Sequence, residues 1–83
     1  MKIHVYDTHV KTAHGQQLHF DVLVDDEHQP RVKEYAEKYL NNLGINNAQI
    51  VTSSCQFCHS EMANPEVQAT IKTQGHYVLP LNV

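Results

Sequence analysis

The chain has 83 residues, of which 41% are hydrophobic, and a formal net charge of -3 with its histidines neutral. This length predicts one domain, residues 1–83, with a small hydrophobic core. Its six Lys and Arg residues are spread along the chain, which excludes the basic stripe of a nucleic-acid binder. No apolar stretch is long enough for a signal peptide or a membrane span, so we expect a cytoplasmic protein without nucleic-acid or membrane partners.

Two segments near the start of the chain predict a β-hairpin. Apolar residues alternate with other residues over 2–10, and they alternate again over 17–24. His14-Gly15 lies between the two segments and fits a two-residue turn, because glycine adopts a positive φ easily.

The position of this turn predicts which residues face each other. A turn centred on His14-Gly15 places Thr8 opposite Asp21 and Tyr6 opposite Leu23. Each row of apolar residues then stays on one face of the hairpin.

A helix and a short strand are expected next. The apolar spacing from Val32 to Leu43 predicts a helix over 30–43, and Gly44 ends it. Residues 48–52 then predict a third strand, and residues 53–62 are expected to form a loop.

The end of the chain predicts a second helix and a last strand. Asn64-Pro65 is a typical helix start, and Gly75 ends a helix near 65–74. Residues 76–81 predict a strand that Pro80 restricts to the edge of a sheet. The order ββαβαβ predicts an α+β domain in which a mixed sheet with an N-terminal hairpin packs against two helices.

Both cysteines lie in the segment Cys55-Gln56-Phe57-Cys58-His59, which has the form C-x-x-C-H. This spacing suits half of a zinc site, for which the candidate additional ligands are the histidines His59, His76, His19 and His9. It also suits a dithiol redox pair or covalent haem attachment, although the lack of an export signal disfavours haem. The fourth interpretation is a pair of inert, partly buried thiols. The cofactor therefore stays open, with zinc as one candidate.

Three motifs give the chain a resemblance to a known family. Tyr6-Asp7-Thr8, His19-Phe20-Asp21 and Cys55-x-Phe57-Cys58-His59-Ser60 together are similar to a small bacterial family catalogued as domain of unknown function two thousand and twenty-four. The resemblance implies a compact single-domain α+β protein without an assigned activity. His9 and Gln56 depart from the Tyr and Arg of the family pattern, and the loss of that Arg would weaken any anion contact there.

The polar residues of the predicted hairpin form a second candidate site. Asp7, His19 and Asp21 are an acid/base set, and Tyr6 and Thr8 add hydroxyl groups for ligand binding. The alternative is structural, with Asp7 and Thr8 bracing the hairpin against a neighbouring loop.

The sequence favours a small non-catalytic binding or interaction domain whose partner is an unknown small molecule or protein. The Cys-x-x-Cys-His loop is its possible metal or ligand locus, next to the polar hairpin. The alternative is an enzyme, a thiol-dependent oxidoreductase that uses Cys55 and Cys58.

Overall fold

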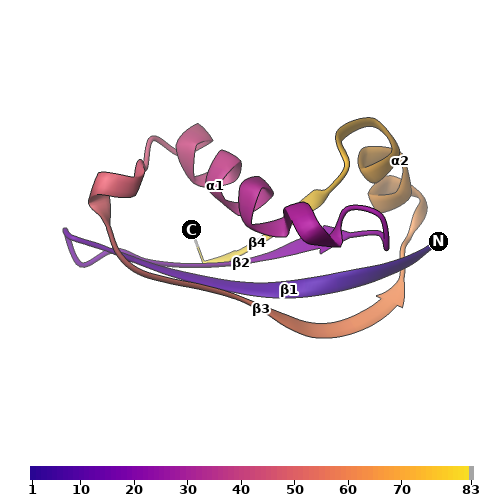
Figure 1. The fold of residues 1–83 in the computed structure, drawn as a ribbon, viewed down its shortest axis with the longest axis horizontal. Helices are drawn as coiled ribbons and strands as arrows, with labels where there is room; N and C mark the ends of the chain where they lie inside the picture. Colours follow the sequence, from indigo (N-terminus) through magenta and orange to yellow (C-terminus); the bar gives the residue numbers. More distant parts are fainter. Residues whose placement is uncertain (83) are drawn as a thin grey trace.

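The computed structural model describes residues 1–82, which form one sheet and two helices (Figure 1). The elements are β1 (Lys2–Thr12), β2 (Gln17–Val24), α1 (Val32–Asn42), β3 (Ile50–Met62), α2 (Pro65–Gln74) and β4 (Tyr77–Asn82). The predicted α+β class and ββαβαβ order are confirmed. No helix within residues 1–82 combines the length and apolar character needed to cross a membrane.

The strand order is β3-β1-β2-β4, and every pairing is antiparallel. The expectation of a mixed sheet is therefore wrong. It assumed that a strand-helix-strand connection joins neighbouring parallel strands. Here α1 connects β2 to β3, and β1 lies between those two strands.

The hairpin forms, but its register differs by one residue from the prediction. Thr8 lies opposite Phe20, and Tyr6 lies opposite Val22. A shift of one residue moves a side chain to the other face of a strand, so the predicted composition of the two faces was also wrong.

The cause of the shift is the length of the turn. The N–H of Gly15 donates to the carbonyl of Thr12 at 3.0 Å, and the N–H of Thr12 donates to the carbonyl of Gln16 at 2.9 Å. Gly15 has a φ of 82°. This is a three-residue loop in which a tight turn is followed by a left-handed glycine, rather than the expected two-residue turn.

One face of the hairpin packs against α1 and forms the larger core. Even-numbered residues of β1 and β2 point to this face, which we call the α1 face. The buried residues of this core are Val10, Leu18, Phe20, Val22 and Val24 of the strands, Val32, Tyr35, Ala36 and Leu40 of α1, and Ile45. Phe20, Val22 and Val24 have no exposed surface.

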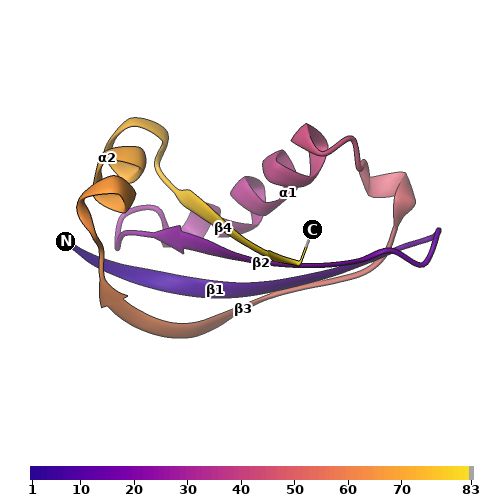
Figure 2. The ribbon, with the colours of Figure 1, turned by 180° about the vertical axis from the view of Figure 1, so that it is seen from behind.

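A smaller core forms on the opposite face, against α2. Ile3, Val5 and Leu23 pack there with Val67 and Ile71 of α2. Successive residues of a strand point to opposite faces, so α2 packs on odd-numbered residues of the hairpin whereas α1 packs on even-numbered ones. Figures 1 and 2 both show α2 beside the N-terminal end of β1, at one end of the sheet.

The two helices begin and end much as predicted. A short 3₁₀ turn, Gln29–Arg31, precedes α1. At the start of α2, the Asn64 side-chain oxygen accepts a hydrogen bond from the N–H of Val67 at 2.9 Å. Gly75 ends α2 with a φ of 85°. The Asn-Pro start and the glycine stop are thus confirmed.

The third strand is far longer than predicted. Residues 53–62, expected as a loop, belong to β3 and pair with β1 over most of its length. Val5 pairs with His59 and Tyr6 with Phe57, so Cys58 is the extra residue of a β-bulge. An edge strand exposed on both sides needs no apolar alternation, and its sequence therefore resembled a loop. β4 forms the opposite edge, as Pro80 predicted.

Candidate functional site

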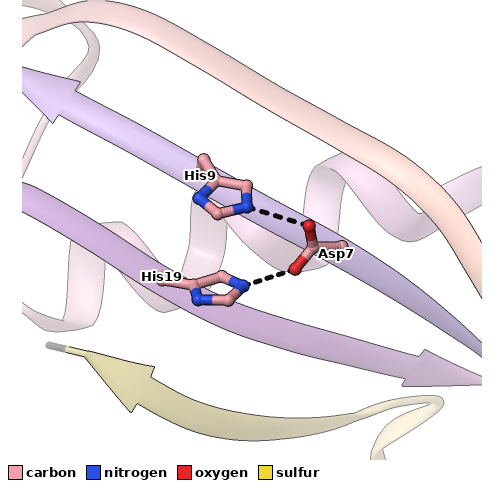
Figure 3. Close-up of side chains that lie close together, drawn as sticks. All are labelled: Asp7, His9 and His19. Atoms are coloured by element: carbon pink, nitrogen blue, oxygen red, sulfur yellow. Dashed lines mark hydrogen bonds and ion pairs between the residues drawn. The ribbon is translucent and has the colours of Figure 1, made fainter.

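Three polar side chains project together from the part of the sheet that lies beyond α2. Asp7 and His9 are two residues apart on β1, so both point to the same face, and His19 of β2 lies directly opposite His9. Figure 3 shows the three side chains on the side of the sheet away from α1. We call Asp7, His9, His19 and the neighbouring Asp21 the open-face cluster.

The carboxylate of Asp7 joins the two histidines. His9 Nε2 donates to Asp7 Oδ2 at 2.8 Å, and His19 Nε2 donates to Asp7 Oδ1 (Figure 3). The two imidazole rings stack with their centroids 4.0 Å apart and their planes 13° apart. One ligand atom from each residue lies within 4.8 Å of the others. The hydrogen bond from His19 is the main reason why the pKa of Asp7 is lowered, and burial acts in the opposite sense.

A second carboxylate faces the first. Asp21 lies opposite Asp7 in the β1–β2 pairing. Burial raises the pKa of Asp21, and the negative charge of Asp7 raises it further. Like charges directly opposite each other destabilise a sheet. A bound cation would remove this unfavourable interaction.

The predicted ligand-binding residues are divided between the two faces. Asp7, His19 and Asp21 belong to the open-face cluster, whereas Tyr6 and Thr8 point to the α1 face. Thr8 is buried, with 2% of its surface exposed.

Tyr6 and Thr8 therefore cannot contact a ligand bound to Asp7 and His19. The hydroxyl of Tyr6 accepts a hydrogen bond from the amide of Gln29 at 3.3 Å, and Thr8 donates to the Cys55 sulfur at 3.4 Å.

The sequence offered His9 only as a distant ligand for the cysteines, and it was missed as a partner of Asp7. The signal that identifies it is the Asp-x-His spacing on a strand, combined with a histidine on the facing strand. Only the correct register brings His9 opposite His19.

The two cysteines lie in different surroundings. Cys55 is partly buried on the α1 face and lines a groove of ≈ 550 Å³ between α1 and β3. Cys58 is exposed at the bulge, where His59 Nδ1 lies 3.2 Å from its sulfur. Both are free thiols.

His76 is held elsewhere, against α1. Its ring stacks on Tyr35 with centroids 4.1 Å apart. Burial lowers the pKa of His76. Within residues 1–82, two groups of His, Cys, Asp and Glu residues bring ligand atoms within 4.8 Å of one another, namely the Asp7, His9, His19 group and a loop group of Asp25, Glu27 and His28. Neither includes Cys55, Cys58, His59 or His76, so zinc at the cysteines stays a prediction.

Comparisons with known proteins agree with the resemblance described above. The chain is similar to protein NE1680 from Nitrosomonas europaea, whose NMR structure has 38% sequence identity and a TM-score of 0.79 and aligns over 98% of this chain and 95% of that one. No curated protein matches the chain. The family model described as Domain of unknown function (DUF2024) matches residues 1–81. The chain therefore belongs to the DUF2024 family.

Proposed function

We propose that the protein is a small binding domain whose ligand is a divalent transition-metal ion held by the open-face cluster. One observation carries this proposal: Asp7, His9 and His19 present three ligand atoms within 4.8 Å of one another. The residues come from two adjacent strands, which hold their backbone positions rigidly. The proposal retains the non-catalytic role and cytoplasmic setting expected from the sequence, and it moves the metal from the cysteines to the hairpin.

The donor set selects a class of metal. Two imidazole nitrogens and one carboxylate oxygen suit zinc, copper, nickel or iron, whereas Mg²⁺ and Ca²⁺ prefer oxygen ligands. Asp21, which lies opposite Asp7, is a candidate for a fourth ligand. A set of three protein ligands would leave a coordination position open for water or a small anion, whereas a fourth ligand would close a tetrahedral site.

Metal binding would replace the hydrogen bonds of the metal-free cluster. A carboxylate only accepts hydrogen bonds, so both histidines carry their proton on Nε2 when they contact Asp7. A metal ion on these nitrogens requires the other neutral tautomer, with the proton on Nδ1. The positive ion would also screen the charges of Asp7 and Asp21, and this gain supports the proposal.

Calorimetric titration of tag-free protein with Zn²⁺ tests the proposal. We expect His9→Ala and His19→Ala each to weaken Zn²⁺ binding by at least about tenfold, because each removes one of three ligands. His14→Ala is the matched control, since His14 is an exposed histidine in the hairpin turn. Mg²⁺ should give no measurable heat. Equal Zn²⁺ affinity in wild type and His9→Ala would contradict the proposal.

One contact favours the thiol-dependent oxidoreductase as the second candidate. His59 Nδ1 lies 3.2 Å from the exposed sulfur of Cys58, and an imidazolium there would favour the reactive thiolate. In this function, Cys55 and Cys58 lose two electrons and two protons to a disulfide substrate and form a disulfide themselves. Incubation in glutathione redox buffers, followed by mass measurement, tests it. A Cys55–Cys58 disulfide that never forms would exclude this function.

A further inference from the structure

We propose that Ser60, His4 and Asp26 form a second site, a hydrolytic triad that cleaves carboxylic esters with an apolar aryl group. The site is independent of the metal cluster. It lies at the end of the sheet where β1 begins, and its side chains lie on or beside the α1 face.

The geometry places one histidine between a hydroxyl and a carboxylate. His4 Nδ1 lies 2.7 Å from Ser60 Oγ, and His4 Nε2 contacts Asp26 Oδ1. Only 8% of the surface of His4 is exposed, whereas Ser60 and Asp26 are exposed. The three residues come from β1, β3 and the loop after β2. The imidazole is therefore fixed in orientation by burial and by contacts at both nitrogens.

The carboxylate selects the tautomer that catalysis needs. An ionised Asp26 accepts hydrogen bonds only, so His4 carries its proton on Nε2. Nδ1 is then the acceptor, and the hydroxyl of Ser60 donates to it. This is the serine–base–carboxylate arrangement of a nucleophilic triad. Here Nδ1 faces the serine and Nε2 faces the carboxylate, the reverse of the arrangement in serine proteases. The proton relay is unaffected, since either nitrogen can accept or donate.

The bulge in β3 supplies an apolar surface next to the nucleophile. Phe57 and Ser60 are three residues apart, a separation that places side chains on opposite faces of a regular strand. The extra residue Cys58 brings both to the face of His4, because Phe57 pairs with Tyr6 and Ser60 pairs with His4. Phe57 is 55% exposed, and the centroid of its ring is 6.3 Å from that of the His4 ring. An aryl group of the substrate can pack there.

The overall reaction is hydrolysis of the ester, with water as the second substrate. Ser60 Oγ forms a bond to the ester carbonyl carbon while its proton passes to His4 Nδ1. The bond between the carbonyl carbon and the alcohol oxygen of the ester then breaks, and the leaving alcohol takes that proton. Water attacks the acyl-serine, again through His4, and releases the acid. Asp26 is a positioning residue that stabilises the imidazolium through Nε2.

Labelling with a fluorophosphonate tests the nucleophile. This probe forms a phosphorus–oxygen bond to an activated serine and releases fluoride. We expect peptide mass analysis of wild type to locate the label on Ser60, and Ser60→Ala to abolish it. Ser54→Ala is the control, because Ser54 is an exposed serine on the same strand. Absence of label on Ser60 would overturn the proposal.

Hydrolysis of p-nitrophenyl acetate in the presence of a chelator tests the positioning residue. The chelator removes any metal-dependent rate, so this result does not depend on the metal proposal. We expect Asp26→Asn to lower kcat by about 10²-fold, the lower end of the range for a positioned base, and to leave KM unchanged. Glu27→Gln, an exposed neighbour, should match wild type. An Asp26→Asn kcat equal to wild type would refute the relay.

Discussion

The two faces of the β1–β2 hairpin are made from alternating residues of the same strands, yet they differ in almost every property. On the α1 face, Phe20 and Val22 are completely buried under a helix. On the other face, His19 and Asp21 stay partly exposed beyond the reach of α2. The α1 face therefore supplies most of the stability, and the open face is free to hold charged side chains at a cost that the core offsets.

The largest expected effect is on the α1 face. Phe20→Ala removes a ring with no exposed surface that contacts Tyr39 with centroids 4.7 Å apart. We expect the free energy of unfolding to fall by about 3–5 kcal/mol, from lost apolar burial and the cavity left behind.

The neighbouring residue provides the matched control for Phe20. His19→Ala, on the open face, should change the free energy of unfolding by no more than about 0.5 kcal/mol. Urea unfolding of both variants measures the difference. Similar losses in the two variants would mean that the open face also carries core stability.

An intermediate effect is expected at Gly75, where the end of α2 meets residues of the α1 side. A Cβ added there would lie 2.5 Å from the Tyr35 hydroxyl oxygen, and the φ of +85° is itself unfavourable for alanine. Gly75→Ala should cost about 1–2 kcal/mol for the left-handed backbone alone, and more for the displacement of Tyr35. Gly44→Ala has a φ of +83° and no atom within 4 Å, so it reports the backbone cost by itself. Equal decreases in melting temperature in the two variants would show that Tyr35 moves aside freely.

A smaller effect concerns acid. Burial lowers the pKa of His76, so the unfolded chain binds a proton more readily than the native state. The free energy of unfolding should not depend on His76 protonation above the ordinary histidine pKa of about 6.5. It should decrease as the pH falls from there towards the lowered pKa. His76→Phe keeps an aromatic ring against Tyr35 and removes this contribution. Unfolding free energies measured across this pH range should fall less steeply in the variant, and parallel curves would contradict the assignment.

The smallest effect is expected from Asp21. Its pKa is raised, so its ionisation weakens the folded state as the pH rises above the ordinary Asp pKa. Asp21→Asn should therefore raise the metal-free stability at neutral pH by a few tenths of a kcal/mol, up to about 0.5. At pH 3 the two proteins should be alike. Thermal unfolding at the two pH values measures this difference, and a destabilised Asp21→Asn protein at neutral pH would show that the carboxylate has a partner there.

The helices and the last strand could be predicted because local signals define them. Asn64 and Gly75 cap α2 through their own backbone and side-chain geometry, and Pro80 restricts β4 to an edge. The length of β3 could not be predicted, because its stability comes from backbone bonds to β1, distant in sequence. The register failed for a related reason, since a two-residue turn and a three-residue turn both fit the sequence around Gly15.

The candidate sites were predictable to a lesser extent. Asp7 and His19 were named as polar residues of the hairpin, but the predicted register placed them on opposite faces, and only the observed register brings them together with His9. His4 and Ser60 are 56 residues apart and meet through the β1–β3 pairing. No spacing motif in a single sequence reports such a contact.

The position of β3 at the edge gives the two proposed sites different lifetimes. Edge strands open more readily than central ones, and local opening exposes amides to exchange with solvent. When β3 separates from β1, Ser60 and Phe57 leave His4, whereas His9 and His19 stay together on the central hairpin. Amide hydrogen exchange in β3 would then set an upper limit on the fraction of time for which the hydrolytic triad is assembled. The metal cluster would persist through the same openings.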